Sequence, residues 1–144
     1  MADENKKLLF IVDGDALFLK SLEIEFEQNT EYIVKTFATG ELCLKKKSLN
    51  PNVIILDYHL NGIRKDAIDG LETLDRIKAY NPEIPVIMLS SQDKIEVAVN
   101  CMKHEAFDYI VKSETAFLRL QKAISDVLHY QKIEQTLSWY MDKM

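Results

Sequence analysis

Two acids, a hydroxyl and a lysine each stand directly after a short apolar run: Asp13, Asp57, Ser90 and Lys112. Carboxylate oxygens bind hard cations and can act as nucleophiles, a hydroxyl donates hydrogen bonds, and an ammonium group pairs with anions as a point charge. Each residue alone is a weak signal, because polar groups often follow strands. The four form a site only if the fold brings their positions together, so the surrounding elements decide the question.

Asp57 ends the clearest of these runs, Val53-Ile54-Ile55-Leu56. An unbroken apolar run rich in β-branched residues favours a strand covered on both faces, as in a parallel sheet. An acid at the carboxyl end of such a strand lies at the edge where open α/β sheets bind ligands. From this run alone, an aspartate that merely ends a strand is an equally good interpretation.

The rest of the chain alternates strand-like and helix-like segments. Apolar runs predict strands at 8–12, 32–37, 53–57, 85–89 and 107–111, and helical spacing predicts helices near 17–29, 39–47, 70–80, 95–102 and 114–128. Thr39 and Asp93 are expected to cap the second and fourth helices. This alternation predicts a doubly wound parallel sheet in a three-layer α/β/α sandwich, in which the four polar residues converge at one edge.

Composition narrows the function classes. The 144 residues suit one main domain, and the net charge of −5 argues against nonspecific nucleic-acid binding by this segment. No apolar run approaches the ~18 residues that a membrane helix needs, and the polar N-terminus is not that of a signal peptide. We therefore expect a cytoplasmic protein without membrane contact. Cys43 and Cys101 lack metal-ligand spacing and are expected to be buried apolar residues.

The order of the polar residues resembles the receiver domain of bacterial two-component response regulators. The likeness extends over about residues 7–129 and rests on an acid after the first strand (Asp13), Asp57 after the third, a hydroxyl after the fourth (Ser90) and Lys112 after the fifth. Tyr109, three residues before the lysine, matches an aromatic position of the family. The segment Ala-Phe-Asp-Tyr-Ile-Val-Lys at 106–112 is especially similar to the family.

This resemblance implies a flavodoxin-like sheet with strand order 2-1-3-4-5 and a phosphoaccepting Asp57. It implies that Lys112 pairs with the carboxylate or the phosphate, that the Ser90 hydroxyl donates to a phosphoryl oxygen, and that Tyr109 then turns inward as the switch. Such a domain is a signalling module rather than an enzyme, and promotes only its own phosphoryl transfer and dephosphorylation. The partner would be a histidine kinase or a phosphotransfer protein.

The resemblance also implies Mg²⁺, held by Asp13, Asp57 and the backbone carbonyl of His59. Receivers usually carry a second acid directly after the first, but this chain has Gly14 there. Asp15 is a further candidate ligand, although its place at the start of a helix could direct it to the helix N-terminus instead. We therefore expect Mg²⁺ to bind more weakly than in receivers that carry both acids.

Three other features depart from the family, one of which is that about thirty residues follow Lys112, more than a receiver's last helix needs. The connection 58–69 is longer than the two to six residues usual between a strand and a helix, and Ser113 stands where the family usually has proline. Residues 1–130 are expected to form the receiver domain, and 131–144 a helical extension or the start of a linker to an output domain beyond residue 144. The extension could also serve a homodimer.

Two alternative functions fit some of the residues. Gly14 is also compatible with a pseudo-receiver that binds partners without phosphorylation. The triplet Asp13-Gly14-Asp15 after an apolar strand resembles the nucleophile motif of haloacid dehalogenase-type phosphohydrolases, in which Asp13 would carry the phosphoryl group. Against the second alternative, no acidic metal motif follows the fourth strand, and the chain has little room for a cap domain.

Overall fold

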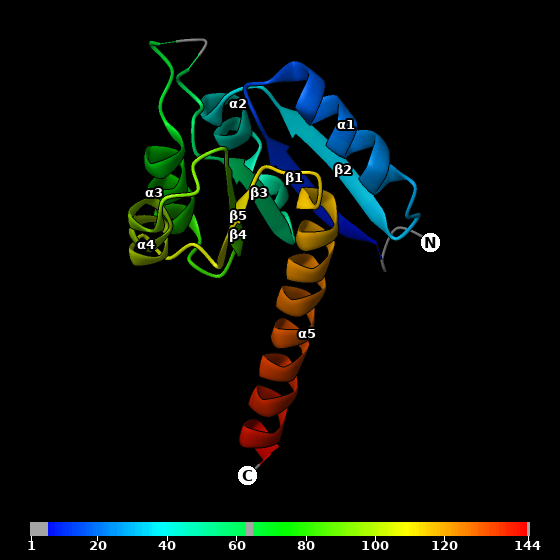
Figure 1. Cartoon of the computed structure of the whole chain (residues 1–144). Coiled ribbons are helices and arrows are strands. Elements are labelled where there is room, and N and C mark those ends of the chain that lie inside the picture. The colour runs from blue at the N-terminus through cyan, green and yellow to red at the C-terminus, as the bar shows by residue number, and fades with distance from the viewer. Residues whose placement is uncertain (1–5, 63–64, 144) are drawn as a thin grey trace.

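A five-stranded parallel sheet lies between two layers of helices in the computed structural model, which describes residues 6–62 and 65–143 (Figure 1). The strands are β1 (Lys7–Val12), β2 (Tyr32–Phe37), β3 (Val53–Asp57), β4 (Val86–Ser90) and β5 (Asp108–Val111). The helices are α1 (Ala16–Glu27), α2 (Gly40–Lys45), the short 3₁₀ helix η2 (Lys47–Leu49), α3 (Gly70–Tyr80), α4 (Ile95–Lys103) and α5 (Ala116–Lys143). The strand order β2-β1-β3-β4-β5 confirms the doubly wound, flavodoxin-like fold expected from the sequence.

The register of the sheet sets the heights of the polar residues. Val12 pairs with Leu56, so Asp13 and Asp57 follow at the same level on neighbouring strands. Ser90 pairs with Val111 at the end of β4, which places Lys112 one residue beyond. All four polar residues therefore lie at the carboxyl edge of the sheet, as the strand pattern predicts.

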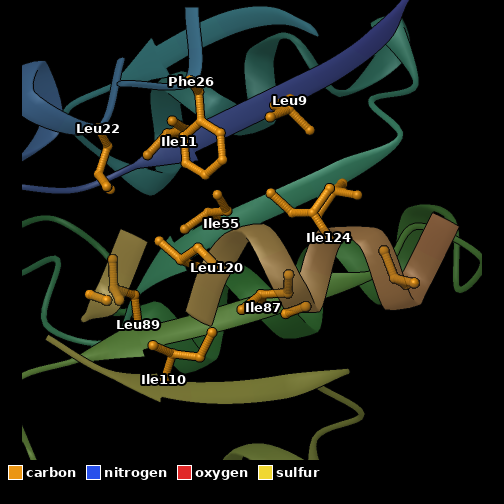
Figure 2. Close-up of a cluster of buried hydrophobic side chains, with 14 residues drawn as sticks. Leu9, Ile11, Leu22, Phe26, Ile55, Ile87, Leu89, Ile110, Leu120 and Ile124 are labelled. Carbon is orange, nitrogen blue, oxygen red and sulfur yellow. The ribbon is translucent and has the colours of Figure 1, made fainter. Parts of the chain in front are cut away.

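Two apolar layers hold the sheet in place. One face packs against α1 and α5 through a cluster that includes Leu22, Phe26, Leu120 and Ile124, and Figure 2 shows these side chains meeting Ile11 and Ile55 of the central strands. The other face is covered by α2, α3 and α4, with both cysteines buried in that layer. Because β3 is buried on both faces along its whole length, its terminal carboxylate is held on a rigid element.

Most helix starts follow the expected chemistry. Asp15, Thr39 and Asp69 accept backbone N–H groups at the starts of α1, α2 and α3. The expected cap of α4 is wrong: the residue before this helix is Lys94, and no side chain caps it. Asp93 therefore stands one position too early, because the helix begins only at Ile95.

The connection from β3 to α3 returns to the sheet edge at Gly70, whose N–H donates to the carbonyl of Tyr58 at 3.1 Å. A Cβ at Gly70 would collide with the carbonyl oxygen of Asp57 and lie 2.7 Å from the Tyr58 backbone. Glu41 of α2 holds the end of the same connection by accepting the N–H of Ile68 at 3.1 Å. The missing side chain thus lets α3 begin directly against the strand that carries Asp57.

Replacing Gly70 with Ala should destabilise the domain by about 1–3 kcal/mol, because the new methyl group meets backbone atoms that cannot rotate away. Gly62→Ala is the matched control, since among the described residues its Cβ would meet the His59 carbonyl oxygen at 3.9 Å, an ordinary contact. Urea unfolding of both variants measures the difference. Equal stability of the two variants would contradict the assigned role of Gly70.

Helix α5 has two parts with different surroundings. Its first part packs on the sheet through buried residues between Ala116 and Val127. From Lys132 to Lys143 every residue is exposed, and Figure 1 shows this part of the helix projecting away from the sandwich. The helix is continuous across residue 130, so the division into 1–130 and 131–144 stays a prediction. Among the described residues, no helix combines the length and apolarity needed to cross a membrane.

Candidate functional site

Asp13, Asp57 and Lys112 meet at the carboxyl edge of the sheet. The Lys112 Nζ lies 2.9 Å from Asp13 Oδ2 and 3.5 Å from Asp57 Oδ1. Both acids are buried, with 1% and 4% of their surfaces exposed. A buried carboxylate requires hydrogen bonds or a counter-charge. The lysine ammonium, which lies close to both acids, supplies the counter-charge.

The charges of the site do not cancel, because the carboxylates of Asp13 and Asp57 share the single ammonium of Lys112. Burial, followed by the charge of Asp57, raises the pKa of Asp13 to about 6, although the Asp15 N–H and Lys112 act in the opposite direction. The Asp15 N–H donates to Asp13 Oδ1 at 2.8 Å. With both acids ionised beside one ammonium, the three groups carry one net negative charge, which would favour a further cation.

The position of Lys112 is fixed from two sides. Its backbone N–H donates to the Ser90 carbonyl at 2.7 Å, which continues the pairing of β4 and β5. The ring of Phe18, from α1, lies over its ammonium with 4.8 Å between Nζ and the ring centroid. An aromatic face attracts a cation, so Phe18 and the two acids together hold the ammonium in the site.

Ser90 and Tyr109 both contact the backbone of Gln92 in the connection between β4 and α4. The Ser90 hydroxyl is fully buried and accepts the Gln92 N–H at 3.0 Å. The half-buried Tyr109 donates its hydroxyl to the Gln92 carbonyl. Burial raises the pKa of Tyr109, and a hydrogen bond with the Ser90 side chain partly offsets this. These contacts use the backbone of Gln92, so its residue type does not predict them. The only sequence signal is that Gln92 stands two residues after Ser90.

The other candidate ligands take different positions. The Asp15 carboxylate caps α1 by accepting the N–H groups of Leu17 and Phe18 at 3.1 and 3.2 Å. His59 donates its backbone N–H to Asp57 Oδ1 at 3.2 Å, while its side chain is exposed. A Cβ at Gly14 would lie 4.0 Å from the His59 carbonyl oxygen. An acid at position 14 would therefore begin next to that carbonyl.

The oxygen atoms at this edge suit a hard cation. Asp13 Oδ2 is buried and receives no hydrogen bond, so the contact with Lys112 is an ion pair only. With Asp57 and the His59 carbonyl, it provides the oxygen ligands that Mg²⁺ prefers. In the described part of the chain, however, no cluster of three or more acidic, histidine or cysteine side chains could hold a metal ion. The oxygen ligands fit Mg²⁺, but they include one carboxylate fewer than a site with a second acid at position 14 would have.

Comparison with protein families assigns most of the chain to one family model. The model of the response regulator receiver domain matches residues 9–125. The nitrogen assimilation regulatory protein NtrX of Azorhizobium caulinodans is 50% identical over 62 residues, which cover 43% of this chain and 13% of that protein. The DNA-binding transcriptional regulator NtrC of Salmonella typhimurium is 34% identical over 132 residues, which cover 89% of this chain and 26% of that protein.

Among solved structures, the CheY-like response regulator receiver domain protein of Methanospirillum hungatei has a TM-score of 0.72 and 27% identity, covering 88% of this chain and 98% of that one. The chain therefore spans a small part of the curated relatives and nearly the whole of a solved receiver domain. Because the family model covers most of the chain and includes the strand ends described above, this protein belongs to the response regulator receiver domain family.

Proposed function

We propose that this chain accepts a phosphoryl group on Asp57 from a histidine kinase or a phosphotransfer protein. The observation that carries the proposal is the position of Asp57, buried at the end of the central strand with the Lys112 ammonium 3.5 Å away. Attack by a carboxylate oxygen on phosphorus needs positive charge near the phosphoryl oxygens, and Lys112 provides it. The product is an acyl phosphate, formed as the bond between phosphorus and the donor breaks.

Asp13, Asp57 and the His59 carbonyl would hold Mg²⁺, with Asp15 as a further candidate ligand. When bound, this ion neutralises charge on the phosphoryl oxygens. The buried Asp13 Oδ2 without a hydrogen bond supports this assignment. Asp15 is the weaker candidate, because its carboxylate caps α1. We expect the affinity to be lower than in receivers with two adjacent acids.

Gly14→Asp should raise the affinity for Mg²⁺ by on the order of tenfold, because a hard cation gains one anionic oxygen. Labelling of Asp57 by acetyl phosphate should become faster in the same variant. Calorimetric titration at matched ionic strength measures the affinity, and intact mass measures the labelling. Gly14→Asn is the matched control, since it adds a side chain of the same shape without the charge.

Two results would contradict this account of Gly14. If Gly14→Asp gains no affinity while Asp15→Ala abolishes metal binding by the wild type, then Asp15 already fills the vacant ligand position. If neither the wild type nor Gly14→Asp is labelled in saturating Mg²⁺, the chain is a pseudo-receiver, the alternative that Gly14 itself favours. Phosphorylation of Asp13 by acetyl phosphate would instead favour the phosphohydrolase hypothesis.

We further propose that phosphate on Asp57 is sensed through Ser90 and Tyr109. The contacts that support this route are the hydrogen bonds of both residues to the Gln92 backbone. If the Ser90 hydroxyl turns to donate to a phosphoryl oxygen, its oxygen moves relative to the Gln92 N–H that it now accepts. A shift of Gln92 in response would alter the partner of the Tyr109 hydroxyl. The switch is thus a local change in charge that acts on a packed loop.

The change at Tyr109 would alter the face formed by α4, β5 and α5. We propose a second copy of this chain as one partner that contacts this face, which would give a homodimer. A groove on this face is lined by residues from β5 and α5, including Tyr109 and the charged residues Asp108, Arg119, Lys122 and Asp126. Two acids and two bases make this surface complementary to itself, as a two-fold contact requires. We also propose that the protein is cytoplasmic. We further propose that it acts together with an output region like those of longer regulators.

A further inference from the structure

The Lys112 ammonium has contacts of two different kinds. Within the described chain, its Nζ lies 2.9 Å from Asp13 Oδ2, 3.5 Å from Asp57 Oδ1 and 4.8 Å from the centroid of the Phe18 ring. Only 20% of the lysine side chain is exposed, so water reaches little of it. Two of these contacts are carboxylate oxygens, and the third is the face of an aromatic ring.

Both acids that contact Lys112 are also the proposed carboxylate ligands for Mg²⁺. Asp13 Oδ2, which lies nearest the ammonium, is the same buried oxygen that supports the metal assignment. A carboxylate that binds a divalent cation attracts an ammonium less strongly, because the cation neutralises its charge and repels the second positive group. The ring of Phe18 is not a metal ligand, so its attraction for the ammonium remains when the acids bind Mg²⁺.

We propose that Phe18 is a positioning residue, which keeps the Lys112 ammonium in the site when the two acids bind Mg²⁺. The inference rests on the proposed function, because it assigns how the lysine stays available to a phosphoryl group on Asp57. An aromatic face attracts a cation without accepting a directed hydrogen bond, as a carboxylate would. The ammonium beside Phe18 therefore keeps its N–H groups free to donate to phosphoryl oxygens.

The position of Phe18 is tied to the site through the start of α1. The Asp15 carboxylate accepts the Phe18 N–H at 3.2 Å, and the Asp15 N–H donates to Asp13 Oδ1 at 2.8 Å. The half-buried side chain of Phe18 also packs against the apolar cluster that α1 and α5 form on the sheet. The helix cap therefore links the ring over the ammonium to the acid that contacts the same ammonium.

The reactivity of Lys112 towards acetic anhydride tests the proposal without phosphorylation. An amine must lose its proton before it is acylated, and the ring both covers Nζ and favours the charged ammonium. In Mg²⁺, Lys112 of Phe18→Leu should therefore react about three- to tenfold faster than in the wild type. Peptide mass spectrometry measures the modification. Without Mg²⁺ the increase should be smaller, because both acids then attract the ammonium fully.

Phe117→Leu is the matched control. Phe117 is also half-buried and packs against the same apolar cluster, but its ring meets that of Phe26, with 4.9 Å between centroids, where Phe18 meets the ammonium. Lys112 should therefore react in Phe117→Leu as in the wild type. Phe18→Tyr, which restores an aromatic face, should return Lys112 to the wild-type rate. Equal reactivity of Lys112 in Phe18→Leu and Phe117→Leu would overturn the proposal.

Fluorinated phenylalanines at position 18 separate the attraction of the ring from its packing. Added fluorine atoms weaken the negative face of the ring and change its shape little, so the protein should stay folded, as thermal unfolding verifies. The acylation rate of Lys112 in Mg²⁺ should then rise stepwise with the number of fluorine atoms. A rate that stays constant across the series would mean that Phe18 only fills space, and would overturn the proposal.

Acetyl phosphate labelling of the same variants separates this inference from the proposed function. Labelling of Asp57 that is about threefold or more slower in Phe18→Leu, and unchanged in Phe117→Leu, supports both. A wild type without labelling, beside faster acylation of Lys112 in Phe18→Leu, would keep the positioning role and reject phosphoacceptance. A labelled wild type, with Phe18→Leu and Phe117→Leu alike in labelling and in acylation, would reject the positioning role alone.

Discussion

Asp57→Asn is expected to abolish labelling of this protein by acetyl phosphate in Mg²⁺. The amide preserves the shape of the side chain, so the buried strand end should stay packed, but it lacks the nucleophilic carboxylate and cannot form an acyl phosphate. Intact mass spectrometry measures the loss, and thermal unfolding verifies that the variant is folded. Asp142→Asn, which removes an exposed acid at the far end of α5, should be labelled like the wild type.

The result that contradicts this prediction is retained labelling in folded Asp57→Asn. Such labelling would identify another nucleophile, and Asp13 would be the first candidate, since it shares the Lys112 ammonium with Asp57. Loss of labelling in Asp142→Asn as well would point to damage unrelated to the site.

The second large effect concerns the pH dependence of stability. The pKa of Asp13 is raised to about 6 in the folded protein, with burial as the main cause and the charge of Asp57 as the next. Between the unfolded value near 4 and this folded value, the native state binds more protons than the unfolded state. The contribution of Asp13 to stability is therefore greatest below pH 4 and is lost as the pH rises towards 6, by about 3 kcal/mol.

Asp13→Asn should remove this titration while its side-chain oxygen still accepts the Asp15 N–H. Between pH 4 and pH 7, the free energy of unfolding of the wild type should therefore fall relative to that of the variant. Urea unfolding at several pH values measures the difference, and Asp142→Asn should show none. A difference between Asp13→Asn and wild type that is constant across this range would mean that the pKa of Asp13 is not raised.

The sequence was sufficient for the framework of the site. Continuous apolar runs marked the strands, and a parallel sheet necessarily brings their carboxyl ends to one edge. This is why Asp13, Asp57 and Lys112 could be predicted to converge, and Lys112 is found within ion-pair distance of both acids. The residue pattern could not show how unevenly Lys112 lies between the acids, because that depends on the packing of α1 and the register of β5.

Other contacts were beyond prediction for identifiable physical reasons. The ring of Phe18 over Lys112 joins elements far apart in the sequence, and helical spacing alone assigns Phe18 only to a core-facing stripe. The Gln92 link between Ser90 and Tyr109 uses backbone atoms, which every residue type carries. Asp93 was mistaken for a cap because a cap depends on where the helix begins, and α4 begins one residue later than the aspartate requires.

Mapping the phosphorylated residue in the wild-type protein tests the central claim most directly. After incubation with acetyl phosphate and Mg²⁺, the acyl phosphate is trapped by reduction and located by peptide mass spectrometry. A single modified position at Asp57, with Asp13 and Asp15 unmodified, is the predicted result. Modification of Asp13 with an intact Asp57, or no modification at any Mg²⁺ concentration, would contradict the assignment of Asp57 as the phosphoacceptor.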